Sequence, residues 1–226
     1  PGIGALTEQL ALRARHVTCY EIDERLKEVL AYSLEEYDNV EIIFEDFLNC
    51  DLKTKVTELK EKYGKVVIAA NLPYYITTAL LFKIFEAKVP LDAITVMMQK
   101  EVADRFTAKV STKDYNALSI ISSVYYDCVP VMKIPRTIFN PKPNVDSAVI
   151  QFRVKQNPLN IEDEQGFFEM VKACFKQRRK TIYNNYREYL KDSDLAQEIL
   201  NEAGIELSAR AETCTMDDFI RLKGVQ

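Results

Sequence analysis

The segment Asn71-Leu72-Pro73-Tyr74 combines residue types that could hold and orient an aromatic amine. It directly follows residues 65–70, KVVIAA, a short apolar run that is typical of a buried strand. A buried asparagine oxygen and a carbonyl freed by the rigid proline can both accept hydrogen bonds from one NH₂ group. They would direct the lone pair of that amine toward an electrophile, and the Tyr74 ring would offer a flat face to a base. The alternative is a simple proline turn after a strand.

A glycine-rich turn at the start of the chain could approach a ligand closely. Gly2 and Gly4 lie in the sequence PGIG, which leads into a helix that we expect to begin near Ala5. Glycine has no side chain to keep a ligand away, and the first N–H groups of a helix are free to bind acidic or polar ligand atoms. The alternative is that the glycines serve only the close packing of the turn.

Two carboxylates follow the next two predicted strands. Glu21 lies about 20 residues after the glycines, where an acidic residue binds ribose hydroxyls in nucleotide-binding α/β folds. The alternative for Glu21 is a carboxylate at a helix start, although Asp23 already supplies one. Asp46 follows the run 40–44 and could accept a hydrogen bond from an adenine amino group. Together these strand ends favour a cofactor that contains adenosine.

Short β-branched runs alternate with helical patterns from residue 5 to residue 99. We predict strands at 17–22, 40–44, 65–70 and 93–99, and helices at 5–15, 23–37, 54–62 and 77–87. Because parallel neighbours need a crossover connection, the alternation predicts an α/β fold with a parallel sheet and helices on both faces. Residues 118–126 and 148–154 flank a proline-rich stretch and are predicted as an antiparallel pair at the sheet edge.

After residue 155 the pattern becomes helical. We expect helices at 164–174, 180–191, 194–203 and 215–223, the third capped by Ser193 or Asp194 and ended by Gly204. The change in pattern predicts two domains, residues 1–155 and residues 156–226.

Positive charge gathers in this second part. Arg178, Arg179 and Lys180, with Lys172 earlier, suit phosphate contacts because arginine forks fit phosphate oxygens bidentately. Residues 129–190 carry 11 basic and 6 acidic side chains, whereas residues 1–50 carry 11 acidic and 4 basic ones. This asymmetry predicts a face for a polyanion. The alternatives are a solvated surface, or a helix end whose basic residues favour the helix dipole.

Composition narrows the class of protein. The 226 residues are 47% hydrophobic and 28% charged, which is ordinary for a globular protein and excludes a disordered chain. No apolar run is long enough for a membrane span, and the start lacks a signal-peptide pattern. Five scattered cysteines predict reduced thiols and a cytoplasmic location. Because His16 is the only histidine, we expect no His-based zinc site and no Ser-His-Asp triad, and we expect no metal in the reaction.

Four strings together resemble a known family. NLPYYITT, MMQKEVADRF, FNPKPNVDSAV and FKQRRKTIYN are similar to the bacterial 16S ribosomal RNA adenine dimethyltransferases, and the resemblance spans essentially the whole chain. It implies a Rossmann-like sheet that binds S-adenosylmethionine, plus a small helical RNA-binding domain. The implied reaction places two methyl groups on the exocyclic amine of each of two adjacent adenosines near the 3′ end of 16S rRNA. The implied partner is that rRNA in an immature small subunit, and we expect a cytoplasmic monomer that binds no membrane.

The resemblance also implies residue roles. Gly2 would belong to the loop at the methionine end of the cofactor, and Glu21 and Asp46 would bind its ribose and adenine. The catalytic segment would be Asn71, Leu72, Pro73 and Tyr74, with Asn71 touching both cofactor and target amine. Tyr74 and Phe139 would sandwich the flipped adenine, and Arg178, Arg179 and Lys180 would bind RNA. No general base is expected, because the sulfonium is a strong electrophile and the amine needs only positioning.

The beginning of the sequence departs from the family pattern. The family's loop reads Glu-x-Gly-x-Gly after a strand, whereas this sequence starts at Pro1 inside that loop. We expect either a fragment or a further upstream segment, and weak cofactor binding by the sequence as it stands.

Three other functions remain open at this point. The related 23S rRNA adenine methyltransferases of macrolide resistance share the catalytic segment, but more often have isoleucine before its proline. A binding-only ribosome assembly factor could have the same fold. A small-molecule methyltransferase is the third, and the basic cluster disfavours it.

Overall fold

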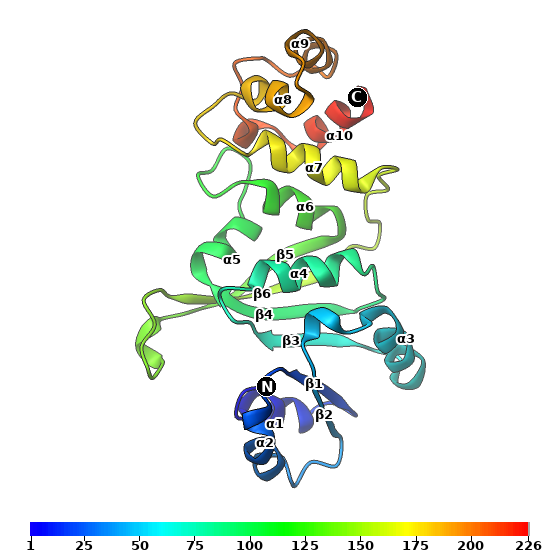
Figure 1. Ribbon diagram of the computed structural model, residues 1–226, viewed down its shortest axis with the longest axis vertical. Helices are drawn as coiled ribbons and strands as arrows, with labels where there is room; N and C mark the ends of the chain where they lie inside the picture. The colour runs from blue at the N-terminus through cyan, green and yellow to red at the C-terminus, as the bar shows by residue number, and fades with distance from the viewer. Residues whose placement is uncertain (226) are drawn as a thin grey trace. The chain divides into compact units, whose positions relative to one another are not determined.

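The computed structural model describes residues 1–225, which form two compact units (Figure 1). The first comprises residues 1–98, and the second begins at Gln99. This division reflects only which residues pack together into a compact unit, so it does not test a division by function. The predicted division after residue 155 therefore stays a prediction.

The first unit alternates strands and helices, as the sequence predicts. Its strands are β1 (Val17–Glu21), β2 (Val40–Phe44), β3 (Val67–Asn71) and β4 (Ala93–Gln99), the last of which ends at the start of the second unit. Its helices are α1 (Ala5–Ala11), α2 (Lys27–Ser33), α3 (Leu52–Tyr63) and α4 (Thr77–Glu86). The helices α1 and α2 are shorter than predicted, and a 3₁₀ turn, Glu24–Leu26, precedes α2.

The strands of this unit pair in parallel, but in two separate pairs. β1 lies beside β2 with Glu21 opposite Phe44, and β3 lies beside β4 with Asn71 opposite Met97. β1 and β2 form a sheet of their own, and β3 is the edge strand of the other sheet. The α/β architecture is as predicted. The four strands do not form one continuous sheet, because within residues 1–225 no strand pairs with the second edge of β1 or of β3.

The second unit combines an antiparallel hairpin with helices. Its elements are α5 (Lys100–Phe106), α6 (Ala117–Tyr125), β5 (Tyr126–Ile134), β6 (Ser147–Val154), α7 (Glu164–Cys174), α8 (Ile182–Leu190), α9 (Ser193–Glu202) and α10 (Met216–Val225). The antiparallel pairing of β5 with β6 confirms the predicted type of pair. Helix α5 was not predicted.

One predicted strand is wrong. Residues 118–125 belong to the helix α6, and β5 begins only at Tyr126. The reason is a capping box at the helix start: the Asn116 side chain accepts a bond from the Leu118 N–H at 2.8 Å, and Ser119 Oγ accepts one from the Asn116 N–H at 3.2 Å. A short apolar run suits a helix or a strand equally, so these capping residues decide between them. β5 continues past Pro130, where the register with β6 shifts.

The C-terminal helices follow the predicted pattern closely. Helix α7 has the predicted bounds, and Phe167, Tyr186 and Phe219 are fully buried among these helices. The cap of α9 is Asp192, whose carboxylate accepts two backbone N–H groups at 3.0 Å, and not Ser193 or Asp194 as predicted. Gly204 follows the end of α9 with φ +71°, as predicted.

The structure also bears on the predictions about membrane spans and cysteines. None of the helices in residues 1–225 combines the length and the apolar character that crossing a membrane requires. The five cysteines are free in the structure, and their reduced state in the cell stays a prediction.

Candidate functional site

The two glycines of the first turn have different surroundings. A Cβ on Gly4 would lie 2.9 Å from Ser33 Oγ and 3.3 Å from Leu34 Cγ, so Gly4 is needed for close packing against α2. A Cβ on Gly2 would meet no atom within 4 Å. Gly2 also has φ +60°, a backbone conformation that favours glycine. The packing alternative therefore explains Gly4, whereas Gly2 keeps an open approach to its backbone.

Glu21, at the end of β1, is held by backbone N–H groups. Its Oε2 accepts a hydrogen bond from the Gly2 N–H at 3.2 Å, and its Oε1 accepts one from the Asp23 N–H at 2.9 Å. Burial acts to raise the pKa of Glu21, whereas these N–H groups and the nearby amino group of Pro1 act to lower it, and the resulting pKa lies below its usual value. The structure thus brings Gly2 and Glu21 together and fixes the orientation of an ionised carboxylate.

Asp46 lies at the same end of the neighbouring strand. It follows Phe44, the last residue of β2 and the register partner of Glu21. Its Oδ1 accepts a hydrogen bond from the Leu48 N–H at 2.9 Å. Its Oδ2 has no partner in the described residues, so this oxygen can accept a bond from a ligand.

The segment from Asn71 to Tyr74 leaves the end of β3 in a fixed conformation. The Leu72 N–H donates to the Met97 carbonyl at 3.2 Å, which extends the parallel pairing one residue past β3. The Thr77 hydroxyl, in the first turn of α4, donates to the Pro73 carbonyl at 2.9 Å. Because the Leu72 and Thr77 side chains are both buried, the segment is anchored on either side of Pro73.

The structure changes one detail of the predicted amine site and specifies another. Asn71 is exposed rather than buried, because it ends an edge strand that β4 covers on one side only. The carbonyl of Pro73 already accepts bonds from the Ile76 N–H and from Thr77 Oγ1. The carbonyl that could serve the amine beside the Asn71 oxygen is therefore that of Leu72. No hydrogen bond within the described chain joins Asn71 to Glu21 or Asp46.

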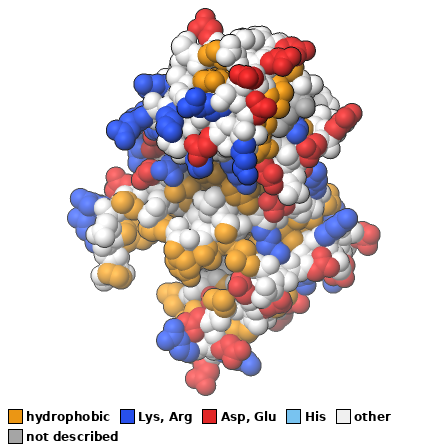
Figure 2. Space-filling view, turned by 45° about the horizontal axis from the view of Figure 1, so that its top comes forward, with side chains coloured by type: hydrophobic (Ala, Val, Ile, Leu, Met, Phe, Trp, Pro, Cys, Tyr) orange, Lys and Arg blue, Asp and Glu red, His pale blue; other side chains and the backbone are white. Residues whose placement is uncertain are grey.

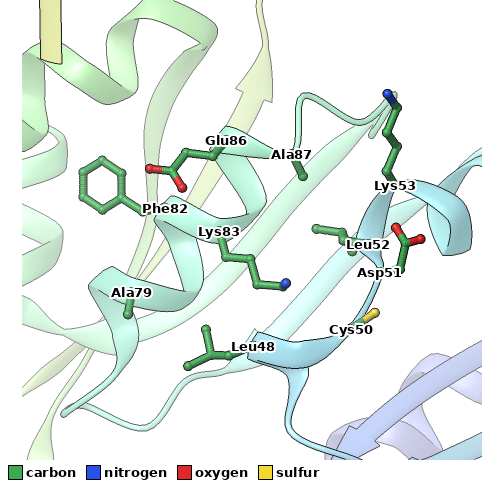
Figure 3. A pocket seen from close by; sticks show the side chains of 10 residues that line it. All are labelled: Leu48, Cys50, Asp51, Leu52, Lys53, Ala79, Phe82, Lys83, Glu86 and Ala87. Atoms are coloured by element: carbon green, nitrogen blue, oxygen red, sulfur yellow. The ribbon is translucent and has the colours of Figure 1, made fainter. Parts of the chain in front are cut away.

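An open groove of about 520 Å³ lies in the first unit, and none of Gly2, Glu21, Asp46, Asn71 or Tyr74 is among the residues that line it (Figure 3). One wall is the segment from Leu48 to Lys53, which follows Asp46, and the other wall is the helix α4. Its lining is Leu48, Cys50, Asp51, Leu52, Lys53, Ala79, Phe82, Lys83, Glu86 and Ala87. Two lysines balance two carboxylates in this lining, so the groove shows no preference for a charged ligand.

Phe139 lies in the second unit, in the connection between β5 and β6. It is half-buried and follows the 3₁₀ turn Arg136–Ile138. Arg136 holds this connection, because its Nη1 donates to the Asn144 carbonyl at 2.9 Å and its N–H donates to Asp146 Oδ1 at 3.0 Å. The pairing of Phe139 with Tyr74 across a base stays a prediction.

The predicted RNA-binding residues lie in the loop between α7 and α8 rather than in a helix. All of them are exposed: Arg178, Arg179 and Lys180. Figure 2 shows Lys and Arg side chains gathered on one side of the helical part. Arg178 pairs with Glu212 at 3.2 Å and Lys176 with Glu188 at 2.7 Å. Arg179 and Lys180 make no ion pair in the described part of the chain, which leaves them available to an anion.

Sequence reasoning missed two residues that shape these sites. Thr77 fixes the Pro73 carbonyl, and the buried Asn185 in α8 bonds the backbone of the basic loop. Asparagine is a poor residue for a helix interior, so the pair Asn184-Asn185 was a usable signal. For metals, residues 1–225 contain no group of three or more His, Cys, Asp or Glu side chains that could hold an ion.

Comparisons with known proteins agree with one another. A family model of ribosomal RNA adenine dimethylases matches residues 1–223. Two proteins named ribosomal RNA small subunit methyltransferase A are similar to this chain over 98% of its length. The one from Bacillus cytotoxicus is 48% identical, with 78% of its own length covered, and the one from Staphylococcus epidermidis is 46% identical, with 77% covered.

A solved structure has the same fold as this chain. The structure of the 23S rRNA methyltransferase ErmE matches the whole chain and 87% of its own, with a TM-score of 0.71 and 27% identity. The identity to the small-subunit enzymes is much higher, so the 23S alternative is not the better supported one. With a Rossmann-like α/β fold and a family match over nearly its whole length, the chain belongs to the ribosomal RNA adenine dimethylase family.

Proposed function

We propose that this protein is an S-adenosylmethionine-dependent dimethyltransferase of two adjacent adenosines near the 3′ end of 16S rRNA. It acts in the cytoplasm, as a monomer, on an immature small ribosomal subunit. The observation that supports this most is the anchored Asn71–Tyr74 segment at the end of β3. Its amide, its Leu72 carbonyl and its aromatic ring are the groups that an exocyclic adenine amine and its base require.

The residues present fit the adenosine part of the cofactor. Gly2 leaves space beside its backbone, Glu21 presents an oriented carboxylate, and Asp46 has an oxygen without a partner. Carboxylate oxygens accept the hydrogen bonds that ribose hydroxyls and an adenine amine donate. S-adenosylmethionine supplies an electrophilic methyl group, so the protein itself has only to hold the amine in place.

The chain's own residues position the nucleophile. The Asn71 side-chain oxygen and the Leu72 carbonyl accept hydrogen bonds from the two N–H groups of the amine. The lone pair of the amine nitrogen then points away from both acceptors. Tyr74 stacks on one face of the base and Phe139 on the other, so the base is held outside its helix. This arrangement works by orientation and needs no general base. Because both methyl groups reach the same nitrogen, the pocket also accepts the monomethylated product.

The basic loop binds the rRNA backbone. Exposed Arg179 and Lys180 contact phosphates, and Arg178 joins them when it leaves Glu212. Such contacts fix the position of the RNA, whereas the Asn71–Tyr74 segment selects the base.

The test is methyl transfer by the protein in its full natural length to undermethylated small subunits, large subunits and naked rRNA, followed by nucleoside mass spectrometry. We expect dimethyladenosine in the small subunits. Dimethyladenosine in the large subunits alone would establish the 23S alternative. Binding to small subunits without any transfer would establish the assembly factor.

A further inference from the structure

The three predicted RNA-binding residues are part of one tight turn. The Lys180 N–H donates to the Gln177 carbonyl at 2.9 Å, which makes Arg178 and Arg179 the two central residues of the turn. The direction in which these cations point therefore depends on how Gln177, the first residue of the turn, is held.

Asn185 in α8 holds that residue at both backbone groups. Its Oδ1 accepts a hydrogen bond from the Gln177 N–H at 3.1 Å, and its Nδ2 donates to the Gln177 carbonyl at 3.1 Å. The same Nδ2 also donates to the carbonyl of Cys174, the last residue of α7, at 2.8 Å. Asn185 is only 2% exposed, so removing its side chain leaves the backbone groups of Gln177 and Cys174 without this partner in the protein.

The other end of the turn is held separately. The Ile182 N–H donates to the Ala209 carbonyl at 2.8 Å, and the Thr181 side chain caps α8. Arg178 is held by Glu212. Within the described residues no such bond holds the side chain of Arg179 or Lys180, so their position rests on the backbone of the turn.

We propose that Asn185 is a positioning residue for RNA binding, which acts by fixing the turn that presents Arg179 and Lys180 to the rRNA phosphates. This rests on the proposed function, in which these two cations contact RNA. Asn185 carries no charge and is buried, so any effect on RNA binding must pass through the backbone groups that it bonds, at Gln177 and at Cys174. The competing explanation is that Asn185 only joins α7 to α8 and stabilises the fold.

The salt dependence of RNA binding separates the two explanations. Asn185→Ala changes no charge, so a smaller salt slope can arise only from cations that have moved away from phosphates. The measurement is the affinity of the full-length protein for a 16S rRNA fragment over a range of salt concentrations, well below the melting temperature. We expect the log–log slope to fall by about 0.7–0.9 for each phosphate that the protein no longer neutralises. Asn185→Ser, whose hydroxyl can keep one of the bonds, should give an intermediate slope and serves if the alanine variant does not fold.

Two controls complete the experiment. Ile199→Ala removes buried volume in α9, which lowers the melting temperature without touching the turn, and should leave the slope unchanged. Arg179→Ala combined with Lys180→Ala should lower the slope, and adding Asn185→Ala should then lower it no further. If Asn185→Ala lowers only the melting temperature while the double variant lowers the slope, the positioning role is overturned and the RNA contact stands. If the double variant itself leaves the slope unchanged, both are overturned.

Discussion

The strand ends of the first unit and the basic turn of the second present charge in opposite ways. At the strand ends, backbone N–H groups bond the carboxylates of Glu21 and Asp46 and fix their orientation. In the basic turn, the charged groups of Arg179 and Lys180 make no bond of this kind within the described residues, and a neutral buried amide holds the backbone instead.

The difference matches the two kinds of ligand. A small cofactor offers a few donors and acceptors at fixed positions, so preorganised protein groups bind it best. An RNA backbone offers repeated charges at many positions, and long exposed cations on a fixed backbone can reach them. The comparison therefore predicts that changes in the first region alter chemistry, whereas changes in the second alter salt-dependent affinity.

The largest expected effect comes from Asn71→Ala. The substitution removes an acceptor that orients the amine, and removing one preorganised polar group commonly lowers the rate by about 10²–10³. Because Asn71 is exposed and its side chain makes no bond in the described chain, the melting temperature should stay unchanged. Single-turnover methyl transfer measures the rate, and a turnover near that of the natural protein would refute the assignment.

The next largest effects are expected from Tyr74 and Phe139, the two residues proposed to stack on the base. Tyr74→Ala and Phe139→Ala should weaken capture of the flipped base by about 1–3 kcal/mol each, the usual value of one aromatic stack on a base. Tyr74→Phe keeps the ring and is the matched control, so it should retain most of the activity. If Tyr74→Phe were as damaging as Tyr74→Ala, the hydroxyl rather than the ring would be the functional group.

The strand ends and the basic turn differ in how much of their structure could be predicted from the sequence. The strands that end at Glu21 and Asn71 were predictable, because short β-branched runs and turn residues are local signals. The exposure of Asn71 was not, because it depends on which strands cover β3. In the second unit, the charges of the turn were evident, and the pair Asn184-Asn185 was a signal within a helix. The partners of Asn185 were not predictable, because the backbone groups of Cys174 and Gln177 come close to it only when α7 packs against α8.

The helix α6 is a second example of structure that the apolar pattern alone could not predict. Its apolar residues fit the period of a helix as well as that of a strand. The helix is favoured by two bonds at its start, from the Asn116 N–H to Ser119 Oγ and from the Leu118 N–H to Asn116 Oδ1. The roles of the site residues themselves stay predictions, since geometry places Glu21 and Asp46 at strand ends and Gly2 beside Glu21 without showing what they bind.

The third prediction concerns the basic turn as a whole. Neutralising Arg178, Arg179 and Lys180 together should weaken rRNA binding and reduce its salt slope by about 0.7–0.9 for each phosphate left without a cation. Cofactor affinity, measured by calorimetry, and the choice of base, measured by nucleoside mass spectrometry, should stay unchanged, because phosphate contacts position the RNA without selecting the base. A lower melting temperature with an unaltered slope would assign the cluster to the scaffold.

The smallest expected effect separates Arg178 from its two neighbours. Arg178 pairs with Glu212 in the free protein, so binding RNA must first break that pair. The pair is partly exposed, and such pairs are worth about 0–1 kcal/mol, so this cost is small. Glu212→Gln removes the competing charge and should therefore raise rRNA affinity at low salt, by less than about fivefold. Arg178→Ala should in turn weaken binding less than Arg179→Ala. Combining Glu212→Gln with Arg178→Ala provides the decisive check: if the gain in affinity persists without Arg178, it arises from the general loss of negative charge and not from the release of this arginine.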